Sequence, residues 1–293
     1  MIICHIVGGL GNQMFQYAAA HACVMRSGSE LRLDLSTFGN RKYINPEGFL
    51  LEKLFGVSTP PATILNKMSV LGVFFPLLRV KNRVRLERLS DSYLVESRLF
   101  EKDPRLDELD SRNAYLNGWW QTASYFKEIE SEILKLFTFR EDSLSAGYVE
   151  LVESISGQNS VAIHVRRGDY VSNEAYREIY GVCSNEYYEA AIRKIQERQV
   201  NTKFFVVTDD PAWVARQSLF ADMQIVSAGS GEGSWNDMYF MSRCRHNIIA
   251  NSTFSWWAAW LNSNSEKIVV CPQNWFANGT KTPDLYPLEW IQV

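Results

Sequence analysis

The sequence predicts an α/β protein whose second half is a doubly wound parallel sheet. In that half, short apolar runs typical of buried strands alternate with stretches of helical length. At the start of the chain, an apolar run, a glycine-rich turn and a helix follow one another, which predicts the opening of another parallel unit. Ligands of parallel sheets bind beyond the carboxyl ends of the strands, so functional residues are expected there.

The first half of the chain is predicted to form one domain, residues 1–150. Its predicted elements are strands at 2–7, 31–35 and 115–120 and helices at 13–26 and 124–137. Residues 38–110 hold five prolines and many charges, and predict less regular structure. The polar stretch at residues 138–158, which contains Gly147 and Gly157, predicts the domain boundary.

The second half, residues 151–293, is predicted to form the other domain. Its predicted strands lie at 161–165, 204–208, 224–226, 247–250 and 267–271, and its predicted helices at 186–199, 211–219, 235–243 and 254–262. Strict alternation of strand and helix predicts right-handed crossovers and a doubly wound sheet.

Composition excludes several classes of function. A net charge of −3 on 293 residues argues against nucleic-acid binding, which requires a basic surface. The five cysteines have no zinc-ligand spacing, and their odd number suits a reducing compartment. The start of the chain has no basic segment typical of a signal peptide, and the longest apolar run, residues 68–78, is too short to span a bilayer. These features predict a cytoplasmic protein without a metal site.

The first chemical motif ends the strand predicted at residues 161–165. His164 and Arg166 share one face of that strand, because side chains alternate between faces. An arginine at the carboxyl end of a strand is costly to bury without an anion, and guanidinium suits phosphate oxygens. We therefore predict that Arg166 binds phosphate. Arg167 either joins it or forms an internal ion pair, for instance with Asp169.

The second motif is a pair of carboxylates after the strand predicted at residues 204–208. Asp210 precedes Pro211 and fits the cap of the next helix. Asp209 is then expected to be free to accept hydrogen bonds from a ligand. A carboxylate can pair with the N1–H and the exocyclic amine of guanine, a donor pair that adenine lacks.

The third motif is the hydroxyl-rich loop after the strand predicted at residues 247–250. Ser252, Thr253 and Ser255 lie where a helix begins, and the free N–H groups of a helix N-terminus favour an anion. The alternative is simple capping of the helix, which requires only Ser252 or Thr253.

The glycine-rich turn at residues 8–12 is weak evidence on its own. It suggests a dinucleotide fingerprint with Asp34 as ribose ligand, but Met14 stands where that fingerprint requires a small residue. The sequence contains no D-x-D triplet, the commonest metal–diphosphate motif of glycosyltransferases.

Five motifs together carry a resemblance to a known family. They are Gly-Gly-Leu-Gly-Asn-Gln-Met-Phe-Gln-Tyr-Ala (8–18), Asn-Gly-Trp-Trp-Gln (117–121), His-Val-Arg-Arg-Gly-Asp-Tyr (164–170), Val-Thr-Asp-Asp-Pro (207–211) and Asn-Ser-Thr-Phe-Ser-Trp-Trp (251–257). In this order they resemble the bacterial α-1,2-fucosyltransferases, glycosyltransferase family eleven.

The resemblance implies a fold and an activity. It implies a GT-B-like fold, in which two Rossmann-like domains face a cleft and the first lies on the acceptor side. It implies GDP-β-L-fucose as donor, a galactose-containing oligosaccharide as acceptor and an inverted, α-linked product. It implies no cofactor and no required metal. Fucosyltransferases of another linkage, a guanine-nucleotide-binding module without activity and a nicotinamide dehydrogenase remain alternatives.

The resemblance also assigns roles to residues. It implies that Arg166 binds the diphosphate and stabilises the leaving group, and it identifies no catalytic base. The full set of candidate donor-binding residues is His164, Arg166, Arg167, Asp169, Asp209, Ser252, Thr253, Ser255, Gly11 and Asn12. His164 and Asp209 are expected near guanine, and Gly11 and Asn12 are expected to face the donor from the other domain.

Residues 70–89 raise a separate hypothesis. Five basic residues between 79 and 88 follow an apolar run, with only Glu87 opposing them. Such a stretch can rest on an anionic membrane, near a lipid-linked acceptor. The alternative is a solvated face beside a core helix.

Overall fold

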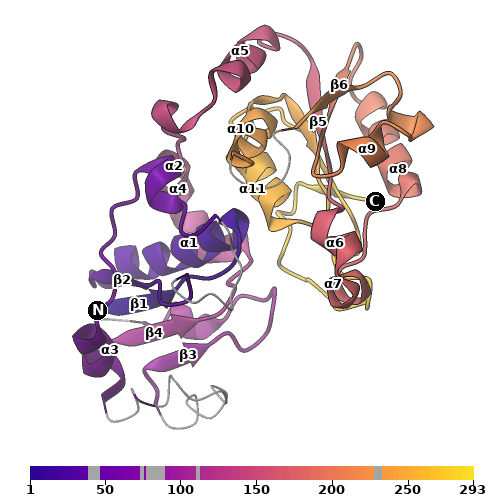
Figure 1. Cartoon of the computed structure of the whole chain (residues 1–293). Helices are drawn as coiled ribbons and strands as arrows, with labels where there is room; N and C mark the ends of the chain where they lie inside the picture. Colours follow the sequence, from indigo (N-terminus) through magenta and orange to yellow (C-terminus); the bar gives the residue numbers. More distant parts are fainter. Residues whose placement is uncertain (39–46, 73–75, 77–89, 110–112, 228–232) are drawn as a thin grey trace. The chain divides into compact units, whose positions relative to one another are not determined.

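The computed structural model describes residues 1–38, 47–72, 76, 90–109, 113–227 and 233–293 (Figure 1). The chain divides into two compact units, Met1–Thr138 with Thr282–Tyr286 and Phe139–Lys281 with Pro287–Val293. The division therefore falls between residues 138 and 139, at the start of the polar stretch, rather than after residue 150. Residues Thr282–Tyr286, near the C-terminus, belong to the first unit. No pattern in the sequence indicates this.

The first unit is built on a four-stranded parallel sheet in the order β2-β1-β4-β3. Its strands are β1 (Ile2–His5), β2 (Leu31–Asp34), β3 (Tyr93–Val95) and β4 (Ala114–Asn117). Its helices are α1 (Leu10–Ser27), α2 (Leu51–Phe55), α3 (Ile64–Leu71) and α4 (Glu130–Leu136), with 3₁₀ turns η3 (Pro104–Leu106), η4 (Ala123–Tyr125) and η5 (Lys127–Ile129). The predicted strands at 2–7, 31–35 and 115–120 are thus confirmed with shorter bounds.

Helix α1 begins earlier than the sequence predicts. Gly9 is its N-cap and Leu10 its first residue, whereas the sequence predicted a turn up to residue 12. The turn before it is tight because Gly8 has a φ of 83°, in the left-handed region that favours glycine. Gly11 and Asn12 therefore belong to the first helical turn and not to a loop.

The second unit contains a six-stranded, all-parallel sheet in the order β10-β9-β8-β5-β6-β7. Its strands are β5 (Ser160–Val165), β6 (Lys203–Thr208), β7 (Gln224–Val226), β8 (His246–Ile248), β9 (Val269–Cys271) and β10 (Ile291–Gln292). The chain moves outward from β5 to β7 and then returns to the centre at β8. The doubly wound sheet is confirmed, and its topological switch point lies between β5 and β8.

Helices cover both faces of this sheet. They are α5 (Ala146–Ser154), α6 (Gly168–Ser172), α7 (Glu174–Ile179), α8 (Asn185–Gln196), α9 (Pro211–Val214), α10 (Trp235–Arg243) and α11 (Thr253–Leu261), with 3₁₀ turns η6 (Glu141–Ser143) and η7 (Ser218–Phe220). The sequence predicted α8 to α11 but not α5, α6 or α7, in which no residue is buried.

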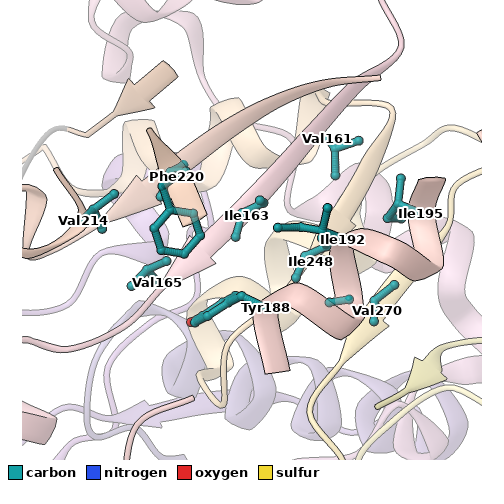
Figure 2. Packing of buried hydrophobic residues seen from close by; sticks show 12 residues of the cluster. Val161, Ile163, Val165, Tyr188, Ile192, Ile195, Val214, Phe220, Ile248 and Val270 are labelled. Carbon is teal, nitrogen blue, oxygen red and sulfur yellow. The ribbon is translucent and has the colours of Figure 1, made fainter. Parts of the chain in front are cut away.

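The core fixes which way β5 presents its side chains. Figure 2 shows Ile163 and Val165 on the face that packs against Tyr188 and Ile192 of α8. The opposite face meets α11, since the ring of His164 lies 5.7 Å from that of Phe254. The predicted alternation along β5 is therefore confirmed, and His164 lies opposite the aliphatic core.

Two further expectations concern membranes. Among the residues that the structure describes, no helix combines the length and apolarity needed to cross a bilayer. The basic segment predicted to contact a membrane, residues 79–88, lies outside the described residues.

Candidate functional site

Three loops of the second unit bring the candidate residues to one edge of the sheet. Arg166 and Arg167 follow β5, Asp209 and Asp210 follow β6, and the loop at residues 249–252 follows β8. Strands β5, β6 and β8 are parallel neighbours, so their carboxyl ends meet at the same edge. This edge includes the switch point, where open α/β sheets bind ligands.

Arg166 is held by two carboxylates. Its Nη2 lies 2.6 Å from Oδ1 of Asp169, and its Nη1 lies 2.8 Å from Oδ2 of Asp209. Its guanidinium carbon also lies 5.4 Å from the ring centroid of Tyr170. The side chain is 31% exposed, so the planar group is fixed by its partners and yet reachable by a ligand. Asp169 therefore pairs with Arg166, and not with Arg167 as the sequence allowed.

Asp209 differs from the sequence-based expectation. Its Oδ1 accepts a hydrogen bond from the backbone N–H of Arg167 at 2.8 Å, while Oδ2 pairs with Arg166. The side chain is only 8% exposed. Asp209 is therefore not free of partners in the fold, and it helps to fix Arg166. Its Oδ2 makes no hydrogen bond within the described residues, so the expected pairing with guanine stays a prediction.

Arg167 is used within the fold. Its Nε lies 3.1 Å from Oδ2 of Asp210, and its guanidinium carbon lies 4.0 Å from the ring centroid of Trp213. Asp210 in turn caps α9, since its Oδ1 accepts a hydrogen bond from the N–H of Trp213 at 3.0 Å. The capping role predicted for Asp210 is confirmed, and Arg167 anchors this helix to the end of β5.

His164 is a buried imidazole with an unused nitrogen. Its side chain is only 4% exposed, and its Nδ1 has no hydrogen-bond partner in the part of the chain that the structure describes. Burial lowers the pKa of His164 to about 4; the nearby carboxylate of Asp209 opposes this shift and Arg166 adds to it. The ring is therefore neutral at pH 7. A buried polar atom without a partner in the fold can be satisfied by a ligand or by a bound water molecule.

The loop between β8 and α11 has a fixed structure. Ser252 is the N-cap of α11, and its Oγ accepts a hydrogen bond from the N–H of Phe254 at 3.3 Å. Ser255 is fully buried, and its hydroxyl lies 3.3 Å from the carbonyl oxygen of Ala250 and 3.2 Å from that of Ser252. The expectation that Ser255 offers its hydroxyl to a ligand is therefore wrong. Thr253, the first residue of α11, is partly exposed.

Sequence reasoning missed Asn251 and Tyr170, although both lie inside the quoted motifs. Asn251 is buried and donates from Nδ2 to the carbonyl oxygens of Tyr180 at 2.9 Å and Trp275 at 3.1 Å. Tyr170 donates to the carbonyl oxygen of Asn251 at 3.2 Å and stacks on Tyr180 with ring centroids 4.9 Å apart. These contacts tie α6 and α7 to the switch point. Their partners are distant in sequence, so no local pattern indicates them.

Gly11 and Asn12 belong to the first unit. Gly11 is buried in α1, and Oδ1 of Asn12 accepts a hydrogen bond from Nε2 of Gln121 at 2.8 Å. Their expected approach to the donor stays a prediction.

The second unit therefore offers a site for a ligand that carries both an anionic group and a group able to hydrogen-bond. The fixed cation is Arg166, the N-terminus of α11 adds its dipole, and the neutral ring of His164 offers a hydrogen bond. The described residues contain no group of three or more His, Cys, Asp or Glu side chains placed to hold a metal ion.

Gly168 provides a test of this geometry. A Cβ on Gly168 would lie 2.6 Å from Oδ2 and 3.2 Å from Cγ of Asp209, a carboxylate held in place by two partners. We expect Gly168→Ala to displace that carboxylate and with it Arg166, lowering turnover by about tenfold or more. Steady-state kinetics would measure it. Gly147→Ala in α5 is the control, because the nearest atom there is 4.0 Å away; equal turnover in both variants would contradict the argument.

Comparisons with known proteins relate the whole chain to one family. The family model described as Glycosyl transferase family 11 matches residues 91–293. An alpha-1,2-colitosyltransferase of Escherichia coli is 33% identical over 100% of this chain and 99% of its own. A mouse galactoside 2-alpha-L-fucosyltransferase is 27% identical over 78% of this chain and 71% of its own. The crystal structure of the fucosyltransferase NodZ from Bradyrhizobium matches with a TM-score of 0.52 at 20% identity, over 88% of this chain and 90% of that one.

The two parallel sheets and the likeness to NodZ define an α/β protein with a GT-B-like fold, as the resemblance implied. Because the family model covers more than half of the chain and the Escherichia coli relative matches along all of it, the chain belongs to glycosyl transferase family 11. The nicotinamide dehydrogenase alternative is thereby excluded.

Proposed function

We propose that this protein transfers L-fucose from GDP-β-L-fucose, with inversion, to the 2-hydroxyl of a β-galactoside and forms an α-1,2 linkage. The observation that carries the proposal is Arg166, fixed by two carboxylates beside the unused Nδ1 of His164 at the switch point of the second sheet. The curated relatives support the linkage, since two of them are named alpha-1,2-colitosyltransferase and galactoside 2-alpha-L-fucosyltransferase.

The site supplies the electrostatics that such a transfer needs. As the sugar leaves GDP, negative charge grows on the β-phosphate and positive charge on the sugar ring. Arg166 and the N-terminus of α11 stabilise the departing diphosphate, and they are in place before the reaction begins. His164 stays neutral and hydrogen-bonds the nucleotide. Inversion follows when the acceptor hydroxyl attacks the face of the sugar opposite GDP.

The direct test is transfer from GDP-fucose to a panel of β-galactosides, free and lipid-linked, with the product linkage determined by NMR. We expect an α-1,2-linked fucoside. A product with a different linkage would overturn the α-1,2 assignment and identify a fucosyltransferase of another linkage. Tight binding of GDP-fucose without turnover on any acceptor would instead favour a guanine-nucleotide-binding module.

A second donor is favoured by one specific observation, the 33% identity with an alpha-1,2-colitosyltransferase along the whole chain. Colitose is L-fucose without its 3-hydroxyl, so the two sugars differ by one hydrogen-bonding group. The ratio of kcat/KM for the GDP-linked forms of the two sugars decides between them. We expect GDP-fucose to be preferred; a preference of about tenfold or more for the 3-deoxy sugar would assign the other donor.

We expect turnover to persist in excess EDTA. The charge of the leaving group falls on Arg166, and the sequence has no D-x-D triplet to hold a metal with the diphosphate. Initial rates with and without chelator, on protein stripped of divalent ions, measure this. Loss of activity in EDTA that Mg²⁺ or Mn²⁺ restores would show that a metal shares the role of Arg166.

A further inference from the structure

The first unit also gathers polar and aromatic groups at the carboxyl ends of its strands. His5 ends β1, Asn117 ends β4, and Glu96 follows β3. Nδ1 of His5 lies 3.1 Å from Oδ1 of Asn117, so a hydrogen bond links the ends of β1 and β4. The loop after β4 carries Trp119 and Trp120.

Glu96 holds that loop by its backbone. Its Oε2 accepts a hydrogen bond from the N–H of Trp119 at 2.8 Å, and its Oε1 accepts one from the N–H of Trp120 at 3.1 Å. The approach is close: a Cβ on Gly118 would lie 2.7 Å from Cβ of Glu96. Gln16, which is fully buried, also donates from Nε2 to the carbonyl oxygen of Gly118 at 3.2 Å.

The two tryptophans of the loop are treated in opposite ways. Trp120 is fully buried and has a φ of 53°, a left-handed conformation that is strained for a bulky residue and is fixed by its surroundings. Trp119 is 39% exposed. All nine tryptophans of the chain lie in the described residues, and Trp119 is the only exposed one. A rigid loop thus holds one indole toward solvent, at the edge where parallel sheets bind ligands.

An exposed indole on a loop with a fixed backbone fits a sugar ring. Galactose presents a continuous C–H face on one side of its ring, which packs on an aromatic plane, and hydroxyls on the rest. Tryptophan provides a large contact area at a low cost in side-chain entropy.

We propose that Trp119 is the binding platform for the acceptor sugar and that Glu96 is a positioning residue that fixes this platform. The inference rests on the proposed function, because it names the acceptor subsite of that reaction. Glu96 does not touch the sugar: both of its oxygens are engaged by the loop backbone.

The first experiment separates acceptor binding from donor binding. Trp119→Ala should raise the acceptor KM about tenfold or more, while the Kd of GDP and the KM of GDP-fucose stay at wild-type values. Trp119→Phe should recover part of the loss. Leu99→Ala is the matched control, since Leu99 is an exposed apolar residue of the same unit that belongs to neither site. An unchanged acceptor KM in Trp119→Ala would overturn the inference; absence of GDP-fucose binding in the wild type would overturn the proposed function instead.

Glu96→Gln tests the positioning role. Burial raises the pKa of Glu96 to about 7, with a further rise from Asp103 and an opposing effect of the two N–H groups. Asp103 itself stays ionised: Arg105 lies 2.6 Å away, and the pKa of Asp103 is lowered to about 2. The neighbouring Tyr125 has a pKa well above neutrality. Among Glu96, Asp103 and Tyr125, only the carboxyl of Glu96 therefore titrates near pH 7.

The sign of the pH effect follows. Below about pH 7 Glu96 gains a proton, loses one acceptor site and holds the loop less firmly, so the wild-type acceptor KM should rise as the pH falls. Glutamine cannot accept both N–H groups, so the variant should show a raised acceptor KM that no longer changes between pH 6 and 8, values chosen about one unit on either side of that pKa. The same pH profile in both proteins would overturn the role of Glu96. If Glu96→Gln fails to fold, Trp119→Ala still decides the platform.

Discussion

Arg166→Ala should be the most damaging substitution in the second unit. Arg166 is the cation that two carboxylates fix at the switch point, and its charge stabilises GDP more as the sugar bond breaks. The loss should therefore appear in kcat more than in the affinity for GDP. The variant would lose two charge-assisted hydrogen bonds from the guanidinium to the diphosphate. Their loss corresponds to roughly 3–6 kcal/mol, or on the order of a hundred- to ten-thousand-fold in rate. Steady-state kinetics and circular dichroism would measure the effect.

Two related variants serve as controls. Arg166→Lys should recover little, because an ammonium group cannot reproduce the planar fork between Asp169 and Asp209. Arg167→Ala should keep turnover within about tenfold of wild type and instead lower thermal stability, since Arg167 packs on Trp213 and pairs with Asp210. A folded Arg166→Ala enzyme within tenfold of wild-type turnover would end the assignment of this residue.

Asp209→Asn should have the second largest effect. The amide keeps the shape of the side chain but loses the charge that pairs with Arg166, so Arg166 is held by Asp169 alone. We expect kcat to fall by roughly tenfold to a hundredfold and the free energy of unfolding to fall by about 1–3 kcal/mol. Discrimination between GDP and ADP should stay unchanged, because we expect the carboxylate to act by fixing Arg166.

Asp210→Asn is the matched comparison, one residue along the chain. Asparagine also caps helices, so α9 should keep its cap, and only the ion pair with Arg167 is lost. Turnover should remain close to wild type. If Asp209→Asn instead weakened GDP binding without changing kcat, the carboxylate would belong to guanine recognition, as the sequence suggested.

The architecture of the second unit could be predicted because its signals are local. Buried strands such as β5 and β6 are apolar runs, and helix α10 carries its periodicity within its own nine residues. Two strands were not predicted: β3 lies within the stretch of residues 38–110, whose prolines and charges indicated irregular structure, and β10 has only two residues, too few for a pattern. The start of α1 was missed because Gly11 and Asn12 are poor helix formers, whereas the buried face of the helix includes Leu10 and Gly11.

The site could be located from the sequence but not fully assigned. Strand ends identified Arg166, His164 and Asp209, since residues after parallel strands gather at one edge. The pairing of Asp209 with Arg166 could not be predicted, because the two residues are 43 positions apart. From the sequence alone, Arg166 and guanine are both possible partners of this carboxylate. Ser255 was misassigned for a similar reason: a hydroxyl in a first helical turn bonds a ligand or a preceding carbonyl, and only the backbone path decides.

The most direct test of the donor site is an experimental structure of the protein with GDP. The account predicts oxygens of the β-phosphate within hydrogen-bonding distance of the guanidinium of Arg166 and facing the N-terminus of α11. It also predicts that Nδ1 of His164 gains a partner from the nucleotide or from a water molecule bound to it. GDP bound elsewhere, with Arg166 paired only to Asp169 and Asp209, would contradict the account.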